Sequence, residues 1–393
     1  MKTTARNAAA LLFAFGLSCH AAQTAPPAAA AKLAAPKADP LTEWVDGLFA
    51  WGAGQTTLEE ITAVKIPGTR IFLAKRVYTV DPGMNDQAHL FVEDGKILIG
   101  DIFYDEDRAK NPGPVRTDSD LTSMRGKLKQ FLVVGFSVAL DPAGDRKNWK
   151  GVTVRTDTGY GSTPMSACIK ADDGTLLVLG RWWDRNRPIA EQRRELIKLT
   201  GVPMTGPADA KVTIVEYSDM QCGFCKKRTA DFDALVSKLG KELKIKRYVK
   251  SFPLTGIHPW AFRAASAGRC FFDLQGADSF FRWKAQVYAK QDELSVTGVD
   301  AFAIDYAYAN DVKDQDFRAC YLQAKSNDKI HADLNEGWAL RVRSTPSYYI
   351  DGVYVSWFSD NLMEEFLRTT YLGGKGLPLP AAPAAAPAAA PKH

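Results

Sequence analysis

The pattern of apolar and polar positions divides the chain into two differently built halves. In the C-terminal half, the apolar run Lys-Val-Thr-Ile-Val-Glu-Tyr at 211–217 predicts a buried strand. The predicted elements are, in order, a strand over 211–217, a helix over 222–239, a strand over 244–250, a largely helical insertion over 258–340, a hairpin over 347–356 and a last helix over 360–371. This order predicts a mixed α/β sheet with helices on both faces.

In the N-terminal half, residues 41–110 and 118–187 repeat one weak pattern. The shared elements are a helix (41–51 and 118–134) and a strand–turn–strand unit (89–100 and 166–180) that turns at Asp94-Gly95 and Asp173-Gly174. An Asp-Gly pair supplies the positive φ angles of a tight hairpin turn. A helix on a curled antiparallel sheet is therefore predicted for each copy, which makes this half an α+β region.

Breaks and linkers set the expected domain boundaries. Residues 187–200 read as an amphipathic connecting helix, which the Gly and Pro residues of 201–207 end. The expected organisation is a signal peptide (1–21), an Ala/Pro-rich linker (22–40), two α+β modules (41–112 and 113–186), a linker helix (187–204), the α/β domain (205–374) and a Pro/Ala-rich disordered tail (375–393).

The N-terminus has the features of a secretory signal. Lys2 and Arg6 precede an apolar stretch over 8–17, and small residues follow up to Ala21 and Ala22. We therefore expect export to the periplasm. A lipoprotein acylated at Cys19 is the less favoured alternative, because Gly16 stands where such sites usually have Leu.

Composition adds little beyond excluding some partners. The formal charge of +5 falls to +3 without the signal, since Lys2 and Arg6 contribute two positive charges. That charge is too small to indicate a nucleic-acid or membrane-surface partner. In an oxidising compartment, paired cysteines are expected to be disulfides or redox centres. The exported chain would keep five cysteines, an odd number, so at least one is free or pairs outside the chain: Cys168, Cys222, Cys225, Cys270 and Cys320.

The motif Cys222-Gly-Phe-Cys225 follows a predicted strand directly and begins a predicted helix. The first turn of a helix presents unpaired backbone N–H groups and the positive end of the helix dipole, and both stabilise a thiolate. We therefore expect a lowered pKa at Cys222 and assign Cys225, one turn further in, as the resolving thiol. The alternatives are half of a zinc site, which lacks two further ligands at matching spacing, and a structural disulfide, whose two-residue loop gains little from closure. No metal or cofactor is expected.

Around this motif the sequence resembles the DsbA-type thioredoxin domains of bacterial periplasmic enzymes. The similarity lies in residues 206–225, in the segment Phe-Pro-Leu-Thr-Gly-Ile-His-Pro-Trp-Ala-Phe-Arg-Ala-Ala that begins at Phe252, and in Ser-Thr-Pro-Ser at 344–347. It covers roughly residues 205–372 and implies a thioredoxin fold with a helical insertion. It also implies that Pro346 is a cis-proline facing the two cysteines and presenting the Thr345 backbone to an extended client peptide. A trans-proline that starts an edge strand is the alternative.

The resemblance assigns further residues. It implies that Gly223 and Phe224 contact the client together with Thr345 and Pro346. Glu216 would be a buried acid that relays the proton of Cys225, with a pKa raised by desolvation; an edge-exposed glutamate is the alternative.

The remaining cysteines and nearby cations leave alternatives open. Some relatives carry a second, structural disulfide, which would here join Cys270 to Cys320; two buried free thiols are the alternative. Cys168, in a hydrophobic hairpin strand, is expected to be a buried inert thiol. The cations over 226–228 could hold the thiolate or form a solvated helix face.

The direction of the redox chemistry is a separate question. The Gly-Phe dipeptide carries no cation, and with Thr345 before the proline it is closer to the DsbC-like isomerases. An N-terminal region ahead of a linker helix is also similar to the layout of DsbC and DsbG, so the two N-terminal modules are expected to be cystatin-like repeats that support a homodimer. The duplication puts that dimer in doubt, because two copies in one chain could pack against each other.

The sequence therefore favours a periplasmic disulfide isomerase or reductase. Its expected partners are unfolded or misdisulfided exported proteins and a membrane thiol-redox protein of DsbD or DsbB type. A DsbA-like oxidase is the first alternative. A second, of another class, is a client-binding chaperone with a subsidiary redox domain, whose surface would carry four aromatic residues: Phe103, Tyr104, Trp182 and Trp183.

Overall fold

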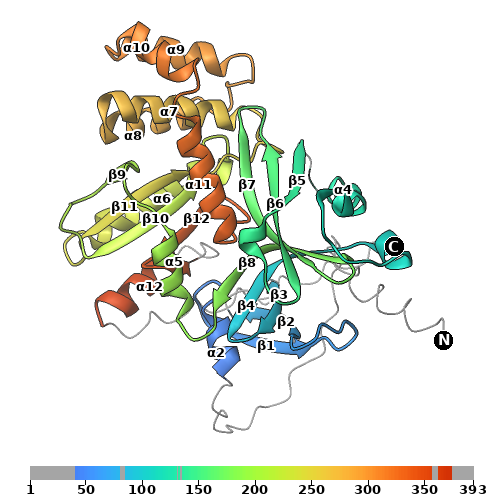
Figure 1. The fold of residues 1–393 in the computed structure, drawn as a ribbon. Helices are drawn as coiled ribbons and strands as arrows, with labels where there is room; N and C mark the ends of the chain where they lie inside the picture. Colours follow the sequence, from blue (N-terminus) through green and yellow to red (C-terminus); the bar gives the residue numbers. More distant parts are fainter. Residues whose placement is uncertain (1–39, 80–84, 131, 133–134, 356–361, 374–393) are drawn as a thin grey trace, which may run out of the picture.

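The computed structural model describes residues 40–79, 85–130, 132, 135–355 and 362–373. Two β-sheets organise them (Figure 1): an eight-stranded antiparallel sheet in the N-terminal half and a five-stranded mixed sheet in the C-terminal half. The predicted signal peptide, the linker before Pro40 and the predicted tail lie outside the described residues. Among the helices within them, none is both long enough and apolar enough to cross a bilayer.

The N-terminal sheet has the strand order β1-β2-β3-β4-β8-β7-β6-β5. Its strands are β1 (Gly54–Glu60), β2 (Arg70–Tyr78), β3 (Asn85–Glu93), β4 (Lys96–Tyr104), β5 (Phe136–Leu140), β6 (Trp149–Asp157), β7 (Ser162–Lys170) and β8 (Leu176–Asp184). Short helical segments accompany them: α2 (Pro40–Asp46), α3 (Glu106–Lys110), η1 (Asp118–Leu121), α4 (Thr122–Leu128) and η2 (Pro142–Gly144).

The order of the strands reveals how the repeat is built. Each copy supplies four consecutive antiparallel strands, and the copies join where β4 pairs with β8. Gly100 and Gly180 lie opposite each other at the middle of this pairing. A Cβ atom on either glycine would come under 3.0 Å from the backbone of the other strand, so both positions need glycine. The strands of the two copies are therefore arranged in mirrored order on either side of this pair of glycines.

The two predicted α+β modules, 41–112 and 113–186, share one continuous sheet, to which the first contributes β1–β4 and the second β5–β8. The predicted helix over 41–51 ends at Asp46, where the carbonyl groups of Gly47 and Leu48 accept hydrogen bonds from Arg193 instead of continuing the helix. The predicted helix over 118–134 is a 3₁₀ turn followed by α4, and residues 131, 133 and 134 lie outside the described residues. The cystatin-like character of each copy stays a prediction.

The C-terminal half has the predicted mixed sheet, with the order β13-β12-β10-β11-β9. Its strands are β9 (Met204–Thr205), β10 (Val212–Ser218), β11 (Ile245–Ser251), β12 (Ser347–Ile350) and β13 (Val353–Val355). β10 pairs in parallel with β11 and antiparallel with β12, which places it at the centre of the sheet. All of its side chains except that of Thr213 are buried, as its apolar run predicts.

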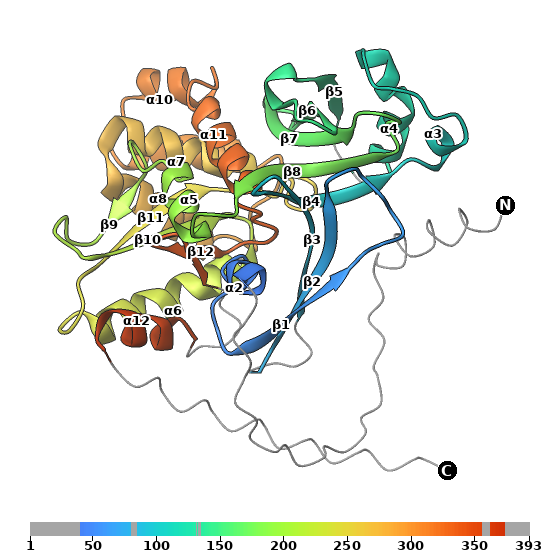
Figure 2. The ribbon, with the colours of Figure 1, turned by 60° about the horizontal axis from the view of Figure 1, so that its bottom comes forward.

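Helices cover both faces of this sheet (Figure 2). The helices of the C-terminal half are α5 (Ile189–Leu196), α6 (Gly223–Leu239), α7 (Ala261–Gln275), α8 (Ala277–Ala289), α9 (Val299–Ala309), α10 (Asp314–Tyr321), α11 (Asn327–Ala339) and α12 (Leu362–Tyr371). On one face, α6 and α12 bury Phe232, Leu239 and Phe366 against the strands. The other face packs against α7 and α11. This is the predicted thioredoxin fold with a helical insertion.

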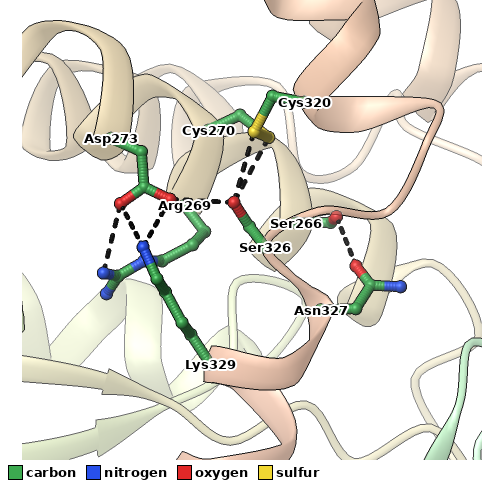
Figure 3. The surroundings of a disulfide bond; sticks show 8 residues. All are labelled: Ser266, Arg269, Cys270, Asp273, Cys320, Ser326, Asn327 and Lys329. Carbon is green, nitrogen blue, oxygen red and sulfur yellow. Dashed lines mark hydrogen bonds and ion pairs between the residues drawn. A yellow bond between two sulfur atoms is a disulfide. The ribbon is translucent and has the colours of Figure 1, made fainter.

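A disulfide joins Cys270 of α7 to Cys320 of α10, with the Cα atoms 5.8 Å apart, and confirms that pairing (Figure 3). The hydroxyl of Ser326 lies 3.2 Å from the Cys320 sulfur and donates to Asp273 at 2.8 Å. Lys329 binds the same carboxylate at 2.8 Å. The disulfide therefore ties the insertion together at the point where α11 begins.

The two sheets share a packed junction. One core cluster contains residues of both, including Leu90 of β3 and Leu334 of α11. Tyr160, in the turn before β7, stacks on Phe262 of α7 with ring centroids 4.8 Å apart. His331 of α11 lies 2.8 Å from the Thr163 hydroxyl. The N-terminal region is thus packed against the C-terminal domain, and α5, the predicted linker helix, lies within this packing.

Candidate active site

Cys222 occupies the place that the sequence predicts, between β10 and α6. It is the N-cap residue of α6, with φ −75° and ψ 119°, so its backbone is still extended while the helix begins at Gly223. Its N–H donates to the carbonyl of Asp219 at 3.2 Å. The Asp219 carboxylate also accepts from the N–H of Gln221 at 2.7 Å. This turn fixes the direction in which the sulfur leaves the backbone.

The Cys222 sulfur is held as a stabilised thiolate. Its pKa is lowered from 9.0 to about 6, chiefly because the thiol of Cys225 donates to it. Burial opposes this shift, while contacts with Thr345 and with the backbone N–H of Cys225 support it. In its protonated form, the Cys222 thiol donates to the Thr345 carbonyl at 3.3 Å. At pH 7 a group with this pKa is about 90% ionised, against about 1% at the ordinary value.

Cys225 has the opposite properties. Its side chain is fully buried beside Cys222 and Tyr288. Burial raises its pKa well above the ordinary value, and hydrogen bonding to Cys222 raises it further. The N–H of Asp219, 3.5 Å from the Cys225 sulfur, offsets only part of this. Cys222 keeps 5% of its surface exposed and Cys225 none, so a thiolate at the edge of the surface lies beside a fully buried thiol, as dithiol exchange requires.

Alkylation of the reduced protein should report this arrangement directly. We expect the rate of Cys222 modification by iodoacetamide to rise with a midpoint near pH 6, because only the thiolate reacts. Below that pH the sulfur is protonated and exchange slows. Cys168 is the internal control, since burial raises its pKa to about 11. A midpoint for Cys222 near that of free cysteine would contradict the geometry.

The residues facing the cysteines lie as predicted. The Thr345–Pro346 peptide bond is cis, as predicted. β12 begins immediately after it, so the antiparallel pairing of β12 with β10 brings Thr345 to Cys222. Phe224 is 72% exposed, and a Cβ at Gly223 would meet open space. The client contacts assigned to these four residues stay a prediction.

Glu216 is buried, as expected, but the predicted direction of its pKa shift was wrong. Desolvation does raise the pKa of this carboxyl group. Two cations outweigh that effect, so the net pKa is lowered. Lys284 of α8 donates to the carboxylate at 2.9 Å, and Arg247 of β11 lies 3.6 Å from its other oxygen. Glu216 is therefore a buried anion held between two cations, and its predicted role as a proton relay stays a prediction.

Several residues of the site were missed in the sequence. Lys284 and Tyr288 lie one helical turn apart on α8, which gave no signal beyond an amphipathic pattern. His258 gave one, since it belongs to the segment that resembles DsbA-type domains. Its Nδ1 atom lies 2.7 Å from the Asp219 carboxylate, which raises the pKa of the imidazole. The negative charge of Cys222 contributes in the same direction, which brings a cation near the thiolate at acidic pH.

The cations after the motif form ion pairs away from the sulfur. Lys226 pairs with Asp292 at 3.4 Å, and Arg228 pairs with Asp231 at 3.0 Å. The side chain of Lys226 is 39% exposed and that of Arg228 is 15% exposed. Within the described residues, no group of three or more His, Cys, Asp or Glu side chains could hold a metal ion.

Comparison with known proteins bears on the same region. The family model described as thioredoxin matches residues 199–368. The matched residues include β9 to β13 and the Cys222–Cys225 motif, so this part of the chain is similar to the thioredoxin family.

Solved structures are similar to the C-terminal half of the chain. BdbD from Bacillus subtilis has a TM-score of 0.39 and 20% identity, over 44% of this chain and 94% of that chain. The thiol-disulfide exchange protein alpha-DsbA2 from Wolbachia pipientis has a TM-score of 0.38 and 20% identity, over 45% and 91%. The catalytic domain of ScsC from Proteus mirabilis has a TM-score of 0.37 and 18% identity, over 46% and 95%.

Curated relatives match over a similar length. Na(+)/H(+) antiporter NhaA 1 of Mycobacterium sp. (strain KMS) is 28% identical over 148 residues, which are 37% of this chain and 23% of the relative. NhaA 3 of Salinispora tropica is 31% identical over 148 residues, 37% of this chain and 21% of the relative. The chain thus spans less than a quarter of these relatives.

Proposed function

We propose that the protein exchanges disulfides in exported proteins, acting as an isomerase or reductase. The observation that carries this proposal is the Cys222 thiolate beside a buried Cys225, with the Thr345 carbonyl 3.3 Å away. An extended client strand would place its own disulfide at this sulfur. The exposed side chains of Phe224 and Ile257, from the α6 start and the loop after β11, offer apolar surface near it.

The exchange proceeds through a mixed disulfide. The Cys222 thiolate attacks one sulfur of the client disulfide, forms a bond to it and releases the other client sulfur as a thiolate. Cys225 then loses its proton and attacks Cys222, which closes the Cys222–Cys225 disulfide and frees the client dithiol. Two electrons pass to the client, and the proton passes to the released thiolate. In isomerisation, a client thiol displaces Cys222 before Cys225 reacts.

The high pKa of Cys225 favours the second route. A buried, protonated resolving thiol attacks slowly, which lengthens the life of the mixed disulfide. Glu216 contributes to this delay, because its negative charge raises the pKa of Cys225. A long-lived intermediate gives a client thiol time to find the correct partner.

The thiolate pKa sets the expected redox poise. Lowering it from 9.0 to about 6 stabilises the reduced state by about 1.4 kcal/mol at pH 7, which raises the potential by roughly 30 mV. This contribution is complete above the higher pKa and is lost as the pH falls through the lower one. The value lies between the pKa of roughly 7 in thioredoxin and roughly 3.5 in DsbA, so a moderate poise is expected.

The equilibrium constant of the Cys222–Cys225 pair with glutathione tests this proposal. We expect a potential between the roughly −270 mV of thioredoxin and the roughly −120 mV of DsbA, together with catalysis of scrambled ribonuclease refolding. A potential at the DsbA end with no refolding activity would favour the alternative, a DsbA-like oxidase.

The burial of its four aromatic residues does not favour the chaperone alternative. Phe103 and Trp183 are buried, and Tyr104 and Trp182 are half-buried, so these aromatics mainly fill the N-terminal sheet's packing. If client binding alone were the function, a Cys222→Ala variant would prevent the aggregation of unfolded clients as well as the wild type does.

The cellular setting also belongs to the proposal. Export to the periplasm rests on the N-terminal sequence pattern, and a membrane partner of DsbD or DsbB type would restore the redox state of the cysteines. A homodimer would need a surface other than the β4–β8 contact, because those strands already pair within one chain.

A further inference from the structure

A cavity of about 230 Å³ lies at the junction of the two sheets, away from the cysteines. Phe49, from the segment after α2, and Asp86 of β3 line its N-terminal side. Arg193 of α5 and Tyr349 of β12 line the opposite side, together with the segment 340–344 that follows α11. The cavity is therefore bounded by both halves of the chain.

Its charged lining is dominated by three arginines. Arg193 is 2% exposed; its guanidinium donates to the carbonyl groups of Gly47 at 2.9 Å and Leu48 at 2.6 Å. Its Nε–H is buried without a partner. No carboxylate among the described residues forms an ion pair with Arg193, although burying an unpaired cation is costly. Burial lowers its pKa accordingly.

The guanidinium of Arg341 has even fewer hydrogen-bond partners. One of its terminal nitrogens reaches the Gln87 carbonyl at 3.4 Å, and the other is buried without a partner. Desolvation lowers its pKa to about 10, and the nearby charge of Arg343 adds to this. Its backbone has φ +67°, a left-handed conformation that side chains of this size seldom adopt. The fold keeps this guanidinium here although its desolvation and its left-handed backbone conformation both cost free energy.

The carboxylates of the lining are fewer than its arginines. Asp86 is the one carboxylate among the lining residues, and it accepts a hydrogen bond from the Tyr78 hydroxyl at 2.5 Å. Arg343 pairs with Asp101 at 2.7 Å, but both partners are more than a third exposed, so this pair is screened by solvent and can exchange. The cavity therefore has an excess of positive charge.

We propose that this cavity binds a ligand through a carboxylate, held by Arg341 and Arg343. A guanidinium offers two parallel N–H groups that match the two oxygens of a carboxylate. The rings of Tyr349 and Phe49 provide apolar walls for the rest of the ligand. The volume accommodates either a small free dicarboxylate or one acidic residue of a peptide.

The cavity and the active site share one stretch of the chain. Ser344 lines the cavity, and the next residue is Thr345, whose carbonyl contacts Cys222. An acidic side chain of a client bound in this cavity would therefore lie near the place where the client strand meets the cysteines. The binding itself does not depend on the redox proposal, since it involves neither sulfur.

Calorimetry on the full chain with oxidised cysteines tests the proposal, in a buffer low in competing anions. The probes are succinate against succinamide, and N-acetyl-aspartate amide against its asparagine analogue. We expect one or both carboxylates to bind and the neutral amides not to bind. Succinate alone would identify a small-molecule site, and the aspartate compound alone would identify an acidic peptide as the ligand.

Variants assign the binding to the cavity. Arg341→Gly removes the guanidinium at a backbone conformation that suits glycine, so the fold should be kept while affinity falls about tenfold or more. Arg343→Gln should also weaken binding, and it decides the matter if Arg341→Gly fails to fold. Arg155→Gln, at an exposed position of β6, is the charge-matched control and should leave affinity unchanged. Absence of carboxylate binding in the wild type, or equal binding by these variants, would overturn the proposal.

Discussion

Replacing Cys222 with serine is expected to reduce insulin reduction and thiol–disulfide exchange to the uncatalysed rate. The hydroxyl that replaces the sulfur is not ionised at neutral pH and cannot form a disulfide, so no mixed disulfide can begin. Cys225 cannot take over, because its side chain is fully buried and its pKa is raised well above the ordinary range. The loss should therefore be complete rather than partial.

The neighbouring cysteine should give a different result. Cys225→Ser keeps the attacking thiolate but removes the resolving thiol, so mixed disulfides with clients should accumulate. Non-reducing electrophoresis followed by mass spectrometry would detect them as adducts at Cys222. In Cys225→Ala the pKa of Cys222 should also rise from about 6, because alanine cannot donate the hydrogen bond that is the largest cause of its lowering.

Cys168→Ser is the matched control. Cys168 is buried in β7 of the N-terminal sheet, and burial raises its pKa to about 11. Its replacement should leave exchange rates unchanged. Exchange that persisted in Cys222→Ser and disappeared in Cys168→Ser would place the chemistry in the N-terminal half and contradict the assignment to Cys222.

The sequence predicted those features that depend on local patterns. The apolar run of β10, the C-x-x-C motif at the start of α6 and the Asp-Gly turns each carry their signal within a few residues. The pattern over 258–340 also predicted the helical insertion, and the resemblance predicted the cis Thr345–Pro346 bond. These elements define the position of both sulfurs and of the cis-proline.

Features that depend on distant residues could not be predicted in this way. β1 (Gly-Gln-Thr-Thr-Leu-Glu-Glu) has no buried side chain, so it lacks the alternation that reveals a half-buried strand. The pairing of Gly100 with Gly180 joins residues eighty positions apart. The pKa of Glu216 depends on Lys284, which approaches from a helix whose sequence gives no indication of that contact.

Replacing Lys284 with methionine is expected to lower the free energy of unfolding by roughly 3–5 kcal/mol. Lys284 is 3% exposed and donates to Glu216 at 2.9 Å, and Glu216 is 1% exposed. Without the ammonium group, only Arg247 at 3.6 Å would face a fully buried carboxylate. Denaturant unfolding of the full chain would measure the loss. Lys290→Met, just after α8 in a half-exposed pair with Glu293, is the control and should cost less than about 0.5 kcal/mol.

The pH dependence identifies the cause. In the wild type the pKa of folded Glu216 lies below its unfolded value, so its contribution is present at neutral pH and is lost as the pH falls through the folded pKa. In Lys284→Met the folded pKa should lie above the unfolded value, so the variant gains stability as its carboxylate becomes protonated. The difference between the two proteins should therefore shrink between about pH 7 and about pH 5. Adding Glu216→Gln to the variant should restore part of the stability at neutral pH, because the buried carboxylate charge is then removed while Arg247 keeps its pair with Asp233 at 3.2 Å. A difference that stayed constant with pH, or a double variant less stable than Lys284→Met, would mean that packing of the lysine stem, and not its charge, holds this part of the core together.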